Sequence, residues 1–112
     1  MLASGTVTLV FTDIESSSSR WEADAPGMRL VLSRHDEILR AAIATFGGSV
    51  CKHTGDGMCA AFTSAPDALA AAETIQTALA AEPWSGGIPL RVRIWLHTGT
   101  ASPTGETISG RR

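Results

Sequence analysis

Two aspartates stand at the edges of apolar segments, and their carboxylates could act together in one site. Asp13 follows the stretch TVTLVFT, and Asp56 lies in the stretch KHTGDGM. Each has a simple structural explanation, because an aspartate before a helix can cap it and an Asp-Gly pair between strands is typical of a hairpin turn. The alternative is a cation site, since two carboxylates that approach each other repel unless a hard cation such as Mg²⁺ lies between them.

Hydrophobic periodicity predicts the elements that carry the first aspartate. Residues 6–12 are rich in β-branched and apolar side chains and predict a buried strand. The serines at 16–19 can then supply an N-cap to a short helix. Apolar residues at 3.6-residue spacing predict a long amphipathic helix between Pro26 and the glycines at 47–48, with His35 at the border of its apolar face.

The second half of the chain predicts two short strands, a helix and a last strand. The stretches SVCK and MCAAF flank the turn that contains Asp56. Ser64, with an aspartate three residues later, resembles a capping box and predicts the start of a second long helix. Apolar and polar side chains alternate in PLRVRIWLH, so we expect one face to pack on the helices and the other, with two arginines and Trp95, to meet a partner. Residues 100–112 show little periodicity and are expected to be a loop or a frayed terminus.

Bulk composition excludes several classes of protein. The 112 residues fit a single domain, 1–112, and 44% of them are hydrophobic. The net charge of −2 argues against nucleic acid and anionic membranes as partners. No membrane segment and no signal peptide are recognised, so a cytoplasmic location is expected. Cys51 and Cys59 are expected to be free, buried thiols, and a disulfide across the hairpin is the alternative.

The element order βαββαβ predicts an α+β fold, a ferredoxin-like sandwich with an antiparallel-rich sheet and both long helices on one face. The first and third strands are central neighbours in such a sheet. If they run antiparallel, Asp13 and Asp56 come to the same end. Mg²⁺ takes one or two carboxylates and completes its shell with substrate phosphates, which backbone N–H groups at a helix start can also bind. The pattern predicts metal-assisted chemistry on a nucleoside triphosphate, by a cyclase or by a polymerase palm.

Four segments of the chain resemble class III nucleotidyl cyclases, and in particular the bacterial adenylate cyclase homology domain. They are TVTLVFTDIESSSSRWE, RHDEILRAAI, GGSVCKHTGDGMCAAF and LRVRIWLHTG, and the similarity runs from about Gly5 to Gly99. The pairing of FTDIE with K-x-x-G-D-G at this separation is more specific than either motif alone. The resemblance implies the cyclase palm core, two chains paired head to tail, and an active site at the interface between them.

The resemblance also implies roles for individual residues. Asp13 and Asp56, with the carbonyl of Ile14, would hold two Mg²⁺ or Mn²⁺ ions. One ion would lower the pKa of the ribose 3′-OH, and the other would hold the triphosphate while that hydroxyl attacks the α-phosphorus in line. Lys52 of the partner chain would select adenine, which favours ATP over GTP, although a solvated lysine at a strand end is the structural alternative. Backbone N–H groups at the helix start would bind phosphate: Glu15, Ser16, Ser17 and Ser18.

The sequence departs from the family pattern at three places. No N-x-A-A-R motif occurs in these 112 residues, and Arg111 and Arg112 are not equivalent to its arginine. In the family, the Asn of that motif orients the ribose and the Arg stabilises the transferring phosphate, and loss of such charge stabilisation commonly costs about 10²–10³ in rate. Ser16 stands where a glycine is frequent and could tighten the phosphate loop. Trp95 stands where a small residue is frequent and could crowd the dimer face.

Two functions therefore compete. The first is an adenylate cyclase domain in cyclic-nucleotide signalling, which converts ATP to 3′,5′-cyclic AMP and pyrophosphate as a homodimer. The second is a catalytically inactive, truncated cyclase homologue that dimerises or binds metal-nucleotide without turnover. Such a chain could form a heterodimer with a complete cyclase domain and donate Asp13 and Asp56 to the shared site. A different palm-type nucleotidyltransferase is disfavoured, because LHTG and RHDEILR fit cyclases better.

Overall fold

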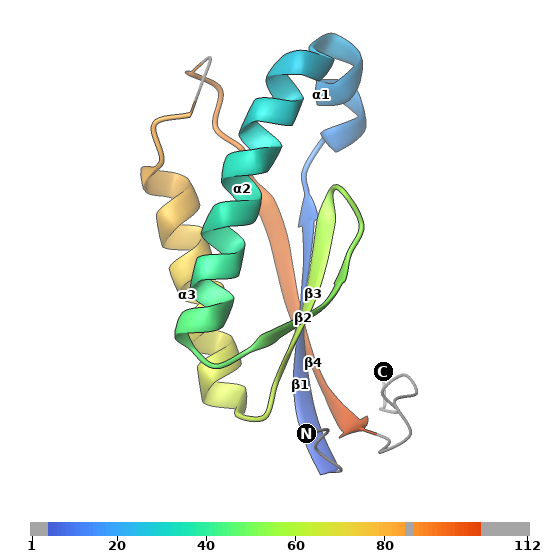
Figure 1. Ribbon diagram of the computed structural model, residues 1–112, viewed down its shortest axis with the longest axis vertical. Helices are drawn as coiled ribbons and strands as arrows, with labels where there is room; N and C mark the ends of the chain where they lie inside the picture. The colour runs from blue at the N-terminus through green and yellow to red at the C-terminus, as the bar shows by residue number, and fades with distance from the viewer. Residues whose placement is uncertain (1–4, 85–86, 102–112) are drawn as a thin grey trace.

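The computed structural model describes residues 5–84 and 87–101, and its elements follow the expected order (Figure 1). The short helix expected after the serines is present before the first long one, so the first crossover consists of two helices. In chain order the elements are β1 (Gly5–Ile14), α1 (Ser17–Ala23), α2 (Ala25–Thr45), β2 (Ser49–His53), β3 (Gly57–Phe62), α3 (Ala65–Ala81) and β4 (Val92–Ala101).

The four strands form one sheet in the order β2-β3-β1-β4, and every neighbouring pair is antiparallel. The long helices α2 and α3 lie side by side on one face of this sheet (Figure 1). No helix of the described residues covers the other face, which we call the open face. The predicted α+β, ferredoxin-like sandwich with its helices on one face is confirmed.

The hydrophobic core lies between the sheet and the two long helices. Strand β3 contributes every second side chain to it, and Met58, Ala60 and Phe62 are each at most 4% exposed. Small side chains of α3 allow that helix to approach the sheet closely. The helical part of the core consists of Met28, Val31, Ile38, Leu39, Ala42 and Ile43 of α2 with Ala68, Ala71, Ile75 and Leu79 of α3.

Side chains cap both long helices. The carboxylate of Asp24 accepts a hydrogen bond from the N–H of Gly27 at 3.0 Å at the start of α2. Ser64 Oγ accepts one from the N–H of Asp67 at 3.2 Å, as the sequence predicted for the start of α3. The expected serine cap of α1 is wrong, because Ser16 has φ 58° and its side chain makes no capping hydrogen bond.

Strand β4 differs from expectation at its end and on its faces. Thr100 and Ala101, expected in a loop, belong to the strand and pair with residues 6 and 5 of β1. Trp95 is 50% exposed on the polar face, as expected, but Leu96 of the predicted apolar face is 38% exposed. The rest of the expected tail, residues 102–112, lies outside the described residues. Among the helices described, none has both the length and the apolar character that a membrane crossing needs.

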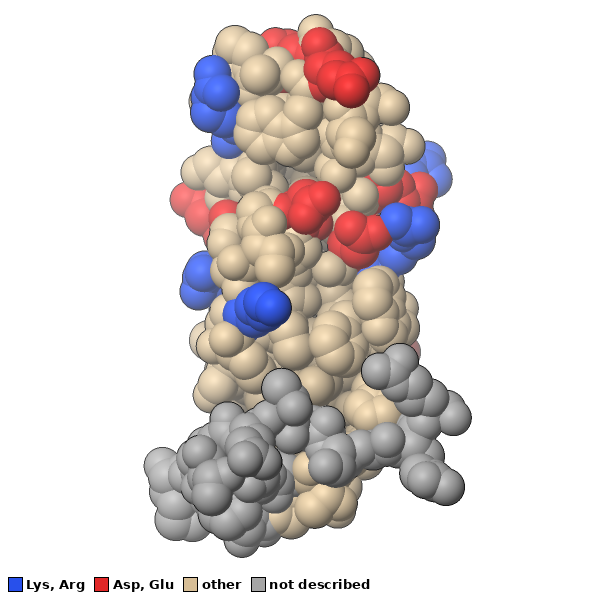
Figure 2. All heavy atoms as spheres, turned by 90° about the vertical axis from the view of Figure 1, so that its right-hand side faces the viewer, with Lys and Arg blue, Asp and Glu red and all other residues tan. Residues whose placement is uncertain are grey.

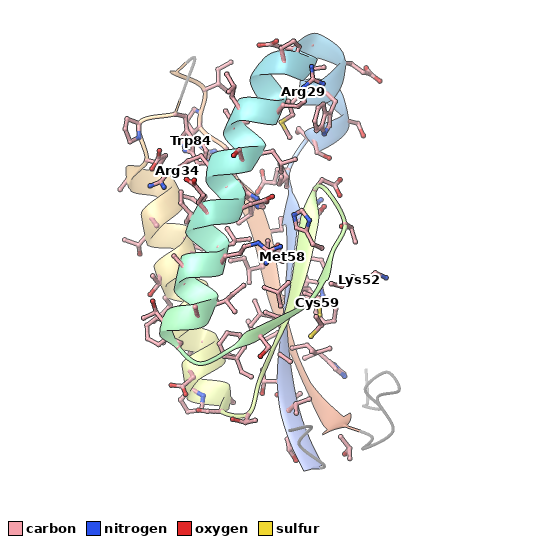
Figure 3. The ribbon with its side chains drawn as sticks, viewed as in Figure 1. Arg29, Arg34, Lys52, Met58, Cys59 and Trp84 are labelled. Atoms are coloured by element: carbon pink, nitrogen blue, oxygen red, sulfur yellow. The ribbon has the colours of Figure 1, made fainter. Side chains whose placement is uncertain are left out.

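The two cysteines are free, as predicted, but they are not both buried. Cys51 is exposed at a register shift in β2, and Cys59 of β3 is half-buried. Met58 and Cys59 are neighbours in β3 and point to opposite sides of the sheet (Figure 3). The thiol of Cys59 therefore lies outside the core and toward the open face.

Candidate active site at one end of the sheet

The antiparallel pairing of β1 with β3 brings the two aspartates to the same end of the sheet. Asp13 lies directly opposite Gly57, the residue that follows Asp56. The N–H of Ile14 donates to the carbonyl oxygen of Asp56 at 3.0 Å. Helix α1 lies at this end, above the β2–β3 hairpin (Figure 1). Residues that are 43 positions apart in the chain are thus held together by one backbone hydrogen bond and the sheet register.

The hairpin that carries Asp56 is closed by its own hydrogen bonds. Both the N–H and the hydroxyl of Thr54 donate to the carbonyl of Gly57, at 3.0 and 3.3 Å. Gly55 has φ 89°, a left-handed conformation that glycine adopts without strain. The Asp-Gly pair therefore does make a turn, and the turn places Asp56 next to the end of β1. The turn explanation and the cation-site explanation of this motif are compatible.

The carboxylate of Asp56 is bound by a residue whose side chain the sequence did not single out. Ser17 Oγ donates to Asp56 Oδ2 at 2.9 Å. Ser17 is the first residue of α1 and is buried, with 9% of its surface exposed. Within residues 5–84 and 87–101, this is the hydrogen bond found for the Asp56 carboxylate, and it engages only Oδ2.

The carboxylate of Asp13 is bound by Arg93 of β4. Arg93 Nη2 forms an ion pair with Asp13 Oδ2, and the two residues face each other in the β1–β4 register. Side-chain exposure is 63% for the arginine and 33% for the aspartate, so water reaches the pair. Figure 2 shows acidic and basic side chains close together on the upper half of the open face. The sequence assigned Arg93 only to a partner face, and the signal that finds it is the antiparallel register with β1.

The segment between β1 and α1 has a defined backbone. The N–H of Glu15 donates to the carbonyl of Arg91 at 2.9 Å and is therefore engaged in this conformation. The first hydrogen bond of α1 runs from the N–H of Arg20 to the carbonyl of Ser16 at 3.1 Å. Since the first N–H groups of a helix have no intrahelical acceptor, those of Ser17 and Ser18 point out of the helix start. These two N–H groups are the ones that the local geometry offers to an anion.

Lys52 lies on β2 beside the register shift and opposite Cys59. Its side chain is exposed and extends away from the helices (Figure 3). This position suits contact with another molecule, and the adenine role expected for Lys52 of a partner chain stays a prediction.

A second polar group joins α2 to the end of β2. The ring of His35 is fully buried, which corrects its expected place at the border of the apolar face. Its Nδ1 lies 2.8 Å from Asp36 Oδ1, and the other oxygen of Asp36 lies 3.1 Å from Nε2 of His53. Burial lowers the pKa of His35, and the hydrogen bond to Asp36 acts in the opposite direction. Nε2 of His35 has no hydrogen-bond partner in the part of the chain that the structure describes.

The described residues contain no group of three or more His, Cys, Asp or Glu side chains that could enclose a metal ion. The donors at the candidate site are instead two carboxylates and nearby backbone carbonyls. Such a donor set fits Mg²⁺, which is usually bound by one or two carboxylates and by substrate phosphates rather than by an all-protein cage. The residues present therefore fit a hard cation that shares its shell with a bound anion.

Comparison with other sequences finds uncharacterized mycobacterial proteins and adenylate cyclases. No protein-family model matches the sequence. The chain is 38% identical over 109 residues to an uncharacterized protein of Mycobacterium tuberculosis, an alignment that covers 95% of this chain and 35% of that protein. It is 40% identical over 80 residues to the adenylate cyclase of Mycosarcoma maydis, covering 71% of this chain and 3% of that one. A receptor-type adenylate cyclase of Trypanosoma congolense is 37% identical over 78 residues, 70% of this chain and 10% of its own.

Solved structures of cyclase domains share the fold. An adenylate cyclase from Trypanosoma brucei in its monomeric state aligns with a TM-score of 0.82 and 25% identity, covering 88% of this chain and 58% of that one. A bacterial light-regulated adenylyl cyclase gives a TM-score of 0.79 at 21% identity, covering 97% and 65%. The chain spans about a third of the length of the mycobacterial relative and a tenth or less of the two adenylate cyclases matched by sequence. Its sequence matches adenylate cyclases over most of its own length and its fold is that of their catalytic domains, so the chain belongs to the class III nucleotidyl cyclase family.

Proposed function

We propose that the chain forms the metal-binding part of an adenylate cyclase-type site, in which Asp13 and Asp56 hold Mg²⁺ or Mn²⁺ together with ATP. The observation that carries the proposal is the antiparallel register that sets Asp13 opposite Gly57, with the backbone bond from Ile14 to Asp56. A single carboxylate at a strand end is common in any fold. Two at one end, next to a helix start, favour a bound cation and an anionic ligand over two independent turn residues.

The residues of this chain have separate tasks in the proposed reaction. Asp13, Asp56 and the carbonyl of Ile14 would supply the protein oxygens for two ions, which when bound would lower the pKa of the ribose 3′-OH and hold the triphosphate for in-line attack. The backbone at Ser16, Ser17 and Ser18 would donate to the phosphates. Arg93 keeps the charge of Asp13 compensated until a cation takes its place.

The exposed position of Lys52 supports the proposed nucleotide and the proposed assembly. Lys52 is exposed and extends away from the helices, so it can reach a second chain (Figure 3). A lysine there favours ATP, in line with the adenylate cyclases among the sequence relatives. A guanylyl cyclase domain of the same fold, from Blastocladiella emersonii, is a non-canonical dimer in one crystal structure and a monomer in another. We therefore include a homodimer, or a heterodimer with another cyclase domain, in the proposal.

A second candidate is binding and pairing without turnover by this chain alone. It is favoured by the lack of an N-x-A-A-R motif in the 112 residues. In that case a partner domain would supply the ribose-orienting and phosphate-stabilising side chains, and this chain would supply Asp13 and Asp56.

Thermal unfolding with metal and nucleotide tests the binding that both candidates share. The chain is heated with Mg²⁺ or Mn²⁺ and a non-hydrolysable ATP analogue. A ligand at 100 times its Kd adds about 2.7 kcal/mol to the free energy of unfolding, which raises the midpoint by several degrees. Asp13→Asn or Asp56→Asn should abolish this rise, and Glu73→Gln on the exposed side of α3 should retain it. A midpoint that neither metal moves at saturation would refute the proposed site.

Turnover separates the two candidates. Cyclic AMP is measured for the chain alone with Mn²⁺-ATP and for the chain mixed with a complete class III cyclase. Turnover by the chain alone that Asp13→Ala abolishes would establish the cyclase and exclude the binding-only candidate. Activity that appears only in the mixture, and is lost with Asp13→Ala, would establish a site shared between chains.

A further inference from the structure

One serine of the run at 16–19 is unlike its neighbours. Ser17 is the single buried residue of α1, whereas Ser16, Ser18 and Ser19 are exposed. Its hydroxyl is not used to cap its own helix. It reaches 39 residues along the chain and donates to the carboxylate of Asp56 at 2.9 Å. A flexible polar linker would not bury one hydroxyl in this way.

The bond from Ser17 completes a two-point attachment of Asp56. The backbone carbonyl of Asp56 accepts from the N–H of Ile14, and its side chain accepts from Ser17. The two donors are the last residue of β1 and the first residue of α1, and only two residues separate these elements. Asp56 is therefore attached at two points to the short stretch of chain that directly follows Asp13.

The chemistry of the donor decides what this attachment can do. A neutral hydroxyl that occupies Oδ2 of Asp56 fixes the side-chain rotamer and leaves Oδ1 free, without cancelling the negative charge that a cation needs. Asp13 is held differently, by the exposed guanidinium of Arg93, which a cation must displace. Asp56 is thus oriented for a metal ion before the ion arrives, and Asp13 is not.

We propose that the Ser17 side chain is a positioning residue that orients Asp56 for the divalent cation. The role concerns the hydroxyl and is separate from the phosphate contacts expected of the Ser17 backbone. It rests on the proposed function, because it presupposes that Asp56 is a metal ligand. Side chains that orient a metal ligand through a hydrogen bond typically contribute about 10–100-fold to metal affinity or activity.

The test measures Mn²⁺ binding by calorimetry, with and without the non-hydrolysable ATP analogue, on the whole chain. Ser17→Ala should weaken Mn²⁺ binding about 10–100-fold. Ser17→Thr keeps a hydroxyl and should restore most of the affinity, which a purely structural role would not require. Ser33→Ala removes an exposed hydroxyl of α2 and should bind as the wild type does. Circular dichroism and the unfolding midpoint show that each variant is folded.

A metal-free measurement keeps the inference separate from the proposed function. Proton couplings of the Asp56 side chain in NMR should indicate a single χ1 rotamer in the wild type and in Ser17→Thr, and averaging in Ser17→Ala. Wild-type protein that binds no Mn²⁺ would overturn the proposed function and this inference with it. If the wild type binds Mn²⁺ and folded Ser17→Ala binds equally well, or keeps the single rotamer, the positioning role alone is overturned.

Discussion

An alanine at Gly48 is expected to destabilise the protein through contact with a single side chain. Gly48 precedes β2, the strand that contains Lys52 and leads to the hairpin of Asp56. A Cβ atom at this position would lie 2.5, 2.6 and 2.9 Å from Cζ, Cε2 and Cε1 of Phe62. Ordinary van der Waals contacts begin near 3.4 Å. The ring of Phe62 is 2% exposed and packed in the core, so it cannot swing away without displacing its neighbours.

The size of the effect follows from the atoms involved. Inserting a methyl group into a packed core costs typically about 1–3 kcal/mol, and we expect Gly48→Ala to fall in the upper half of this range because three ring atoms clash at once. All three belong to the far end of the phenyl ring and are missing from leucine. In a Phe62→Leu background the same alanine therefore meets none of them, and its cost should fall well below 1 kcal/mol.

A double-mutant cycle measures this coupling. Urea unfolding of the wild type, Gly48→Ala, Phe62→Leu and the double variant gives four free energies of unfolding. The double variant should be more stable than the sum of the single losses predicts, by about 1–2 kcal/mol, within the range for residues in contact. Losses that add within about 0.5 kcal/mol would refute the reasoning, since residues without a shared contact behave in that way.

Three further predictions concern titration and ion pairing. Burial lowers the pKa of His35 below its ordinary 6.5. Below about pH 6.5 the unfolded chain therefore binds a proton that the folded chain does not. As the pH falls through this range, the free energy of unfolding decreases by up to about 1.4 kcal/mol per pH unit. Urea unfolding at several pH values should show that His35→Leu reduces this slope, and an unchanged slope would contradict the assignment. Burial, with the nearby Cys51, raises the pKa of Cys59 to about 11 from an ordinary 9.0, so its thiolate fraction at pH 8 is about a hundredfold lower. Peptide mass spectrometry after iodoacetamide treatment should therefore find the exposed Cys51 labelled first, and equal rates would argue against the burial. Arg93→Gln removes an exposed ion pair with Asp13, worth about 0.2–1 kcal/mol, and calorimetry without nucleotide should show Mn²⁺ binding up to about 5-fold tighter.

Much of the fold follows from patterns within single elements. The 3.6-residue spacing predicted α2, and the Ser64 cap predicted the start of α3. The order of strands and helices predicted that β1 and β3 are central neighbours, and from this came the adjacency of Asp13 and Asp56. No long-range contact had to be known for these steps, because the split βαβ topology allows few arrangements.

The features that the sequence did not predict depend on contacts between distant segments. Arg93 alternates with apolar residues as any strand arginine does, and only the β1–β4 register sets it opposite Asp13. The sequence does not distinguish the four consecutive serines, but in the structure Ser17 is the one that is buried and donates to Asp56 of the β2–β3 hairpin. His35 was expected at the border of a helix face, but Asp36 is paired with both His35 and His53. The pairing gives Nδ1 of His35 a hydrogen bond, although the ring is fully buried.

The two aspartates have different kinds of partner, a hydroxyl at Asp56 and a guanidinium at Asp13, and this difference bears on the proposed binding of a cation. Asp56 is fixed by a partly buried hydroxyl and by its own backbone, neither of which competes for the charge of the ion. Asp13 is compensated by a guanidinium that water reaches, and breaking such an exposed pair costs at most about 1 kcal/mol. The repulsion between two carboxylates is thus relieved in the metal-free protein without a rigid ion pair at either of them. If Mg²⁺ or Mn²⁺ binds as proposed, the exchange of partners occurs at Asp13 alone, and the hairpin that carries Asp56 keeps its hydrogen bonds.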